Sequence, residues 1–226
     1  DELLAEDLGS LLVRDGLPVS SKDISPDIRE GFALRFENVD FAYPDASRPI
    51  LEKASFSVTP GQTVFIKGTN GSGRSTLLGL MAGFYTPDVG SITIFGDEAR
   101  TIDRSRLSQL VGYLPQRAVM YDGTLLQNAT MFRDDIADDA IATARQLGYE
   151  DFILALPQGW ETRVGDSAAE SLPPGLRQRI GIIRGLAPNP DILLFDDATA
   201  SMDNEGEAKM LAYLNAVKGK KTVILV

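Results

Sequence analysis

The stretch Val64–Thr76 reads V-F-I-K-G-T-N-G-S-G-R-S-T, and it decides the fold of the chain. It begins as a short apolar strand, and the apolar run Leu77–Phe84 that follows it predicts a helix. Between strand and helix, Gly68, Gly71 and Gly73 permit a tight turn whose backbone N–H groups point inward. Such a turn, placed at the positive end of a helix, forms a cradle for phosphate groups.

The turn matches the phosphate-loop pattern Gly-x-x-x-x-Gly-Lys-Ser/Thr at every defined position except one. Gly68 and Gly73 occupy the glycine positions and Ser75 supplies the hydroxyl, but Arg74 stands where the pattern has Lys. In the pattern, the Lys reaches the β- and γ-phosphates and the hydroxyl holds Mg²⁺. A Gly-rich strand-to-helix turn that binds no ligand is the alternative interpretation of the same residues.

The composition excludes several kinds of chemistry. The net charge of −10 argues against sequence-independent binding of nucleic acid, which needs a basic surface. The chain has no Cys and no His, so disulfides, thiol chemistry, His general bases and His metal ligands are excluded. No apolar run approaches the length of a membrane span, and no signal peptide is visible.

The ends of the chain lead us to expect a piece of a longer protein. The first residue is Asp1, and the last residues, Thr222–Val226, read as a buried strand with no terminator, so we expect a C-terminal truncation. Residues 1–17 place five leucines on one helical face, and Pro18–Asp27 is polar with two prolines. The leucines are Leu3, Leu4, Leu8, Leu11 and Leu12. We therefore interpret Pro18–Asp27 as a linker.

Along the domain the pattern changes from β-rich to α/β, then to helical, then to α/β again. The expected strands are Phe32–Phe41, Ile50–Val58, Gln62–Lys67, Ser91–Phe95, Val111–Leu114, Asp191–Phe195 and Lys221–Val226. Besides Leu77–Phe84, the expected helices are Asp103–Ser108, Asp134–Leu147, Glu150–Leu156, Pro174–Leu186 and Asp203–Val217. This order predicts an α/β fold with a parallel-sheet core and an inserted helical subdomain at about residues 124–187.

A second motif of phosphate chemistry is the apolar run Ile192–Phe195 followed by Asp196 and Asp197. A buried strand that ends in a carboxylate can place that group beside a phosphate loop, where it holds Mg²⁺ or a water on the metal. Apolar strands often end in Asp, so the motif gains weight only from its place after the phosphate loop and the intervening helices.

From about residue 30 to residue 226 the chain resembles the nucleotide-binding domain of an ABC transporter. The resemblance rests on motifs that fall in family order, namely Gly68–Thr76 as Walker A, Tyr113–Gln116 as the Q-loop, Ser171–Ile180 as the signature, Ile192–Asp197 as Walker B and Ala200–Asp203 as the D-loop. Residues 156–166 resemble a stretch of exporters that faces the coupling helices of the membrane domain. The resemblance implies that residues 1–30 are a linker from a missing membrane domain and that residues 31–226 are the ATP-binding domain. The fold it implies is of the P-loop NTPase type, with a mainly parallel core sheet, an antiparallel β subdomain and the inserted helical subdomain. The subgroup that is most similar is that of bacterial exporters with fused membrane domains, including type I secretion ATPases.

The resemblance implies ATP and Mg²⁺ as cofactors and assigns roles by position. It places Tyr43 on adenine, Ser75, Gln116 and Asp196 on Mg²⁺, and Asp197 and Gln116 in catalysis. The implied nucleotide contacts also include Gly68, Thr69, Asn70, Gly71, Ser72, Gly73, Arg74, Ser75 and Thr76, together with Pro173, Pro174, Gly175 and Asp203. Asp203 would contact the partner domain across a dimer, although a helix N-cap is an equally compatible reading. Without a functional role, Tyr43 would be an ordinary residue at the end of a strand, and Gln116 would be a solvated polar residue before a loop.

The chain departs from the family pattern at catalytic positions. Arg74 replaces the Walker A Lys, and its planar fork is not interchangeable with a compact ammonium. Asp197 replaces a Glu that positions the attacking water, and it is one methylene shorter. Pro173, Pro174 and Leu176 replace the signature Ser, first Gly and Gln, so hydrogen bonds to the γ-phosphate of the opposite subunit are lost. The switch His expected after the last strand is absent, which the expected truncation also explains.

The resemblance implies an ATP-binding domain that couples ATP binding and hydrolysis to export, as part of a membrane protein and on the cytoplasmic face of the inner membrane. Its implied partners are a second nucleotide-binding domain, identical or not, and a membrane domain of the same parent chain; nucleic acid is not among them. The departures predict weak hydrolysis. The alternative is a regulatory or gating domain that binds ATP without hydrolysing it. A non-transport ABC ATPase of DNA repair or translation, and a P-loop kinase, explain fewer of the motifs.

Overall fold

The computed structural model describes residues 12–14, 31–44, 46–69, 71–165, 172–198 and 202–226. Asn70, Ser171 and the D-loop residues Ala200 and Ser201 lie outside these ranges. The chain divides into two compact units. The first takes the described residues up to Val111 together with 191–194 and 218–226, and the second takes 112–190 and 195–217.

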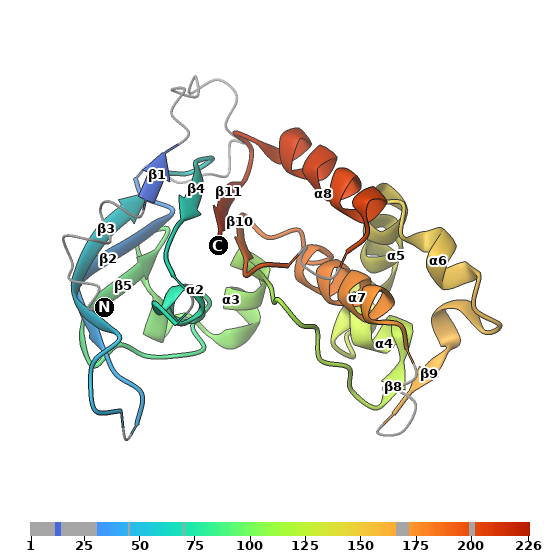
Figure 1. Ribbon diagram of the computed structural model, residues 1–226, viewed down its shortest axis with the longest axis horizontal. Coiled ribbons are helices and arrows are strands. Elements are labelled where there is room, and N and C mark those ends of the chain that lie inside the picture. The colour runs from blue at the N-terminus through green and yellow to red at the C-terminus, as the bar shows by residue number, and fades with distance from the viewer. Residues whose placement is uncertain (1–11, 15–30, 45, 70, 166–171, 199–201) are drawn as a thin grey trace. The chain divides into compact units, whose positions relative to one another are not determined.

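An antiparallel sheet forms one layer of the first unit (Figure 1). The strand order is β3-β2-β5-β6, with bounds Leu51–Val58, Leu34–Phe41, Val89–Ile94 and Asp97–Glu98. Buried apolar side chains such as Leu34 and Phe36 alternate with exposed ones along β2, as expected for a sheet with one face on the core. The predicted antiparallel subdomain and its three main strands are confirmed, with small shifts at the ends.

The second sheet has the order β1-β4-β11-β10-β7. The bounds are Leu12–Arg14, Thr63–Ile66, Thr222–Leu225, Ile192–Phe195 and Val111–Leu114. β11 pairs parallel to β4, with Val223 opposite Thr63. All four residues of β10 are buried, which is typical of a central strand in a sheet covered on both faces. The helices of the first unit are α2 (Arg74–Met81), the 3₁₀ turn η1 (Ala99–Thr101) and α3 (Arg104–Leu110).

The helical face predicted for residues 1–17 is wrong at Leu12–Arg14, which form strand β1. β1 pairs antiparallel with β4, and Leu12 lies opposite Ile66. A sheet edge offers a row of unpaired backbone groups, and pairing with it overrides the leucine spacing. The other residues of that segment lie outside the described ranges.

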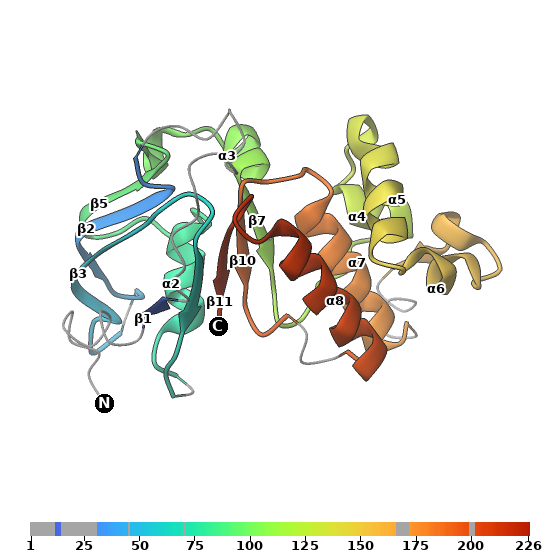
Figure 2. The same cartoon turned by 90° about the horizontal axis from the view of Figure 1, so that it is seen from above.

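Helices dominate the second unit, where α7 packs against α4 and α5 in both views (Figures 1 and 2). The bounds are α4 Leu125–Thr130, η2 Asp134–Ile136, α5 Ala137–Gln146, α6 Glu150–Leu154, η3 Gly159–Glu161, α7 Pro174–Leu186 and α8 Asn204–Val217. A two-stranded sheet pairs β8 (Gly123–Thr124) with β9 (Arg163–Val164). The predicted helices of this stretch are confirmed, and α4 is an additional one. Across the described ranges, no helix is both long and apolar enough to cross a bilayer.

Candidate nucleotide-binding site

The turn between β4 and α2 has the geometry that its glycines predict. Gly71 and Gly73 have φ angles of 82° and 86°, in the left-handed region that favours glycine. Gly73 is the N-cap of α2, and a Cβ added to it would lie 2.6 Å from Ile50 Cγ2. The chain therefore turns from strand into helix at a point where only glycine fits.

The turn suits a phosphate group on three further counts. A Cβ added at Gly68 would lie 2.4 Å from Ser72 Oγ, so the loop folds closely on itself. Ser72 Oγ is buried and has no hydrogen-bond partner among the described residues. The first turn of α2 carries no acidic side chain that would repel an anion. A buried hydroxyl without a partner costs about 1–3 kcal/mol, and a phosphate oxygen can supply that partner.

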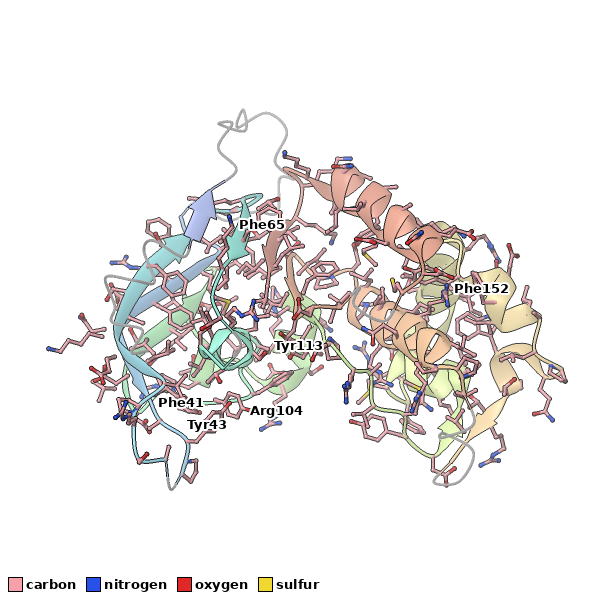
Figure 3. The ribbon with its side chains drawn as sticks, in the orientation of Figure 1. Phe41, Tyr43, Phe65, Arg104, Tyr113 and Phe152 are labelled. Carbon is pink, nitrogen blue, oxygen red and sulfur yellow. The ribbon has the colours of Figure 1, made fainter. Side chains whose placement is uncertain are left out.

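Tyr43 lies beside the first turn of α2. Its hydroxyl oxygen is 2.9 Å from the hydroxyl oxygen of the buried Thr76. Its ring makes an edge-on contact with Phe41 at a centroid distance of 5.3 Å (Figure 3). A second edge-on contact joins it to Tyr85, at a centroid distance of 5.4 Å. The neighbouring Tyr43 hydroxyl raises the pKa of Tyr85. With 36% of its surface exposed, Tyr43 keeps ring area for a flat partner next to the phosphate loop.

In the second unit, the two carboxylates after β10 differ in their surroundings. Asp196 is 7% exposed, its Oδ2 accepts a hydrogen bond of 2.8 Å from the Tyr113 hydroxyl, and its N–H donates to the Leu114 carbonyl. Asp197 is partly exposed and has a φ angle of 47°, a left-handed conformation that Asp tolerates better than most residues. Asp196 is thus fixed by β7, whereas the backbone turns sharply at Asp197.

Helix α7 begins without a polar cap. Pro173 is its N-cap residue and makes no side-chain hydrogen bond, and Pro174 is the first helical residue. The N–H groups of Leu176 and Arg177 both donate to the Pro173 carbonyl. Pro174 has no N–H group. Among the first four helical residues, Gly175 is therefore the one whose N–H could donate to a ligand. Leu176 is only 6% exposed and packs into the core of the unit.

Asp203 caps helix α8. Its Oδ1 accepts from the Gly206 N–H at 2.9 Å, and its carboxylate accepts from Arg179 Nη2 at 3.1 and 3.2 Å. The Gly206 amide lowers the pKa of Asp203, and the Arg179 charge lowers it further. The guanidinium of Arg179 lies 4.0 Å from the ring centroid of Phe152 and also faces Tyr149, whose burial raises its pKa to about 12. The N-cap reading of Asp203 is confirmed.

The predicted site residues fall on both units. Tyr43 and the loop Gly68–Thr76, apart from Asn70, belong to the first unit. Gln116, Pro173–Gly175, Asp196, Asp197 and Asp203 belong to the second, where Gln116 is exposed. The predicted Mg²⁺ ligands come from both units and stay a prediction. The described residues contain no group of three or more acidic side chains placed to hold a metal ion.

Sequence reasoning missed the contacts that hold the predicted site residues in place. Thr76 contacts Tyr43 from 33 positions away, and Tyr113 contacts Asp196 from 83 positions away. The motif pattern assigns Tyr113 to the Q-loop and gives it no contact with Asp196. No local pattern indicates such pairs, because they depend on how strands are ordered in the sheets.

A strand, a glycine-rich phosphate loop and a helix in this arrangement define a P-loop NTPase. Residues 51–200 match the ABC transporter family, and the chain belongs to that family. It is 38% identical over 194 residues to ATP-binding cassette sub-family B member 6 of Rattus norvegicus. The aligned residues cover 85% of this chain and 23% of that protein. It is 36% identical over 201 residues to a probable ABC transporter ATP-binding/permease protein of Haemophilus influenzae, covering 88% and 36%.

A solved structure supports the same conclusion. The structure of a bacterial Atm1-family ABC exporter with ATP bound matches with a TM-score of 0.76 and 35% identity, over 89% of this chain and 36% of that one. This chain thus spans about a third or less of the relatives to which it is compared. The family and the P-loop NTPase fold predicted from the motifs are confirmed. The more specific similarity to type I secretion ATPases stays a prediction.

The contacts of Asp203 predict a pH dependence of stability. Because the folded-state pKa of this carboxyl is lowered, its ionised form stabilises the fold above the ordinary Asp pKa of about 3.9, and this contribution is lost as the pH falls through the lower folded-state value. Asp203→Asn, which keeps an N-cap oxygen, should reduce the free energy of unfolding at pH 7. The difference from wild type should shrink towards pH 3.

Urea denaturation at several pH values measures this effect. Asp151→Asn, at an exposed position in the first turn of α6, is the matched control and should leave the free energy of unfolding at pH 7 nearly unchanged. A difference for Asp203→Asn that stays constant from pH 7 to pH 3 would show that the carboxylate charge does not stabilise the fold.

Proposed function

We propose that this chain binds Mg-ATP as the nucleotide-binding domain of an exporter, and that it hydrolyses ATP weakly. The observation that carries the proposal is the turn between β4 and α2. Two left-handed glycines, an acid-free helix start and the unpartnered Ser72 hydroxyl form a cradle that fits phosphate groups. The family match supports the same nucleotide chemistry.

The loop residues Gly68–Thr76 would hold the phosphates, mainly through backbone N–H groups, and Arg74 would add a positive charge. Tyr43 would stack on adenine, which its partly exposed ring beside α2 supports. Ser75, Asp196 and Gln116 are the proposed Mg²⁺ ligands. Bound Mg²⁺ neutralises charge on the phosphates, and the chain's own contribution is to orient the oxygen ligands.

The weak hydrolysis rests on two features of the second unit. Asp197, the proposed water-positioning group, is one methylene shorter than Glu, and a misplacement of about 1 Å costs roughly 10²-fold in rate. The start of α7, which would face the nucleotide of a partner domain, is built from Pro173 and Pro174 and offers few hydrogen-bond donors. Each missing charge-assisted hydrogen bond forfeits roughly 1.5–3 kcal/mol.

The same two features favour a second candidate function, a gating domain that binds ATP and pairs with another nucleotide-binding domain without turning ATP over. In a heterodimer, this chain would weaken its own ATP site and also the site to which its α7 contributes. The two candidates share the cradle and differ only in turnover.

Export is proposed from the relatives. The Haemophilus influenzae relative is named as an ATP-binding and permease protein, and the structural relative is an exporter. The same proposal implies a parent protein with a membrane domain and a second nucleotide-binding domain as partner. It also implies a position on the cytoplasmic face of the membrane. The transported substrate is not part of it.

Calorimetric titration with Mg-ATP tests the cradle. Gly73→Ala should weaken ATP binding at least about 10-fold, because the new methyl group collides with Ile50 and the left-handed φ disfavours Ala by about 1–2 kcal/mol. Gly96→Ala is the matched control, since Gly96 has a φ of 88° but open space around its Cβ position. It carries the same backbone strain away from the loop and should leave ATP affinity within about twofold.

If neither the wild type nor the control binds Mg-ATP, the proposed function fails. If Gly73→Ala and Gly96→Ala weaken binding equally, general destabilisation rather than the cradle explains the loss. Arg74→Lys belongs in the same titration series, and binding that appears only with Lys would identify Arg74 as the cause of a defective site.

Steady-state turnover separates the two candidate functions. Wild-type turnover should fall below the 1–10³ s⁻¹ typical of enzymes, and Asp197→Glu should raise it, by up to roughly 10²-fold where the missing methylene limits the rate. Asp191→Glu, at the exposed residue before β10, is the control and should leave turnover unchanged. Turnover of several per second in the wild type would contradict the proposal of weak hydrolysis, whereas no turnover in either protein would favour the gating domain.

A further inference from the structure

Gln178, in the second turn of α7, is a buried side chain whose amide is fully used. It is only 2% exposed. Its Nε2 donates to the Pro115 carbonyl at 2.7 Å and to the Ala198 carbonyl at 2.8 Å, and its Oε1 accepts from the Ala118 N–H at 3.3 Å. A side-chain amide has two N–H donors and one oxygen, so these bonds fix both the position and the orientation of the group.

The three backbone partners flank the proposed functional residues of this unit. Pro115 directly precedes Gln116, and Ala118 follows it by two positions. Ala198 directly follows Asp197. One buried side chain therefore connects the segment of Gln116 with the segment of the two carboxylates.

Close packing holds the Gln116 segment against the same helix. A Cβ added at Gly181, one turn after Gln178, would lie 2.4 Å from the Ala118 Cβ, so α7 and this segment are in direct contact. At 2% exposure, water cannot easily replace the lost hydrogen bonds if the Gln178 amide is removed. The Pro115 and Ala198 carbonyls would then lack a buried donor and both segments would relax.

We propose that Gln178 is a positioning residue for Mg²⁺, because it holds the segments of Gln116 and Asp196, the two metal ligands proposed on this unit, in one fixed relation. This inference rests on the proposed function. It predicts that Gln178 affects the part of ATP affinity that depends on Mg²⁺, and that it leaves the metal-free part, which the phosphate loop and Tyr43 supply, unchanged. A residue that only stabilises the fold would alter both parts alike.

The experiment is a titration of ATP with and without Mg²⁺, the latter in the presence of a chelator, for the wild type and Gln178→Met. Met has a similar length and volume but no hydrogen-bond donor. The readout is the dissociation constant of ATP without Mg²⁺ divided by that with Mg²⁺, measured for each protein. A reduced folded fraction affects both constants equally and cancels in this ratio. The ratio should fall about 10-fold in Gln178→Met, the lower end of the effect of outer-shell partners on metal affinity. Gln146→Met, at the exposed end of α5, is the matched control and should keep the wild-type ratio.

Each outcome of this titration either supports or overturns the inference. An unchanged ratio in folded Gln178→Met overturns the inference and leaves the proposed function intact. A wild type that binds ATP without any enhancement by Mg²⁺ overturns it too, whereas a wild type that binds no ATP overturns the proposed function itself. If Gln178→Met does not fold, Gln178→Glu, which keeps the oxygen acceptor and loses both donors, should show the same 10-fold fall. Failure of both variants to fold would make Gln178 a folding residue only.

Discussion

The left-handed backbone at Gly73 is the constraint on which the first unit depends. With φ at 86° and no room for a Cβ beside Ile50, the chain leaves β4 and enters α2 within one turn. The loop thus runs directly into the start of α2, and the positive end of a helix favours an anion at that point. Directly behind that point, Thr76 and Leu77 are buried, and Thr76 anchors Tyr43. The adenine and phosphate parts of the proposed site thus share one rigid helix start.

The second unit depends on α7 in a different way. The helix begins with two prolines and no side-chain cap, whereas two side chains of its next turn make long-range hydrogen bonds. Gln178 bonds to the segments on either side of it, and the adjacent Arg179 bonds to Asp203 and lies over Phe152. The positions that would face a partner's nucleotide are therefore degenerate, while the positions that hold the unit's own loops are intact. This contrast is what a domain retained for binding and coupling, rather than for fast turnover, would show.

The elements were predictable from the sequence wherever local chemistry specifies them. Helix α7 has the predicted bounds because Pro174 suits a first helical position and the apolar spacing continues to Leu186. The phosphate loop was predictable because positive φ angles require glycine at Gly71 and Gly73. Strand β1 was not, since its partner β4 lies far along the chain and the leucine spacing favoured a helix.

The supporting contacts of the candidate site could not be predicted for the same reason. Tyr113 reaches Asp196 only because β7 and β10 bring residues 83 positions apart into contact. The 63-residue separation between Gln178 and Pro115 likewise hides their hydrogen bond from any local pattern. Motif spacing identifies the groups that carry the chemistry, whereas the groups that orient them are set by tertiary packing.

Amide hydrogen exchange on this chain, with and without Mg-ATP, tests the proposed phosphate cradle. We expect ATP to slow exchange at backbone amides of the loop between β4 and α2, because N–H groups there would donate to phosphate oxygens. The edge of the antiparallel sheet at β3 should be unaffected. Protection that is absent from the loop, or spread evenly over the first unit, would contradict a phosphate cradle at the start of α2.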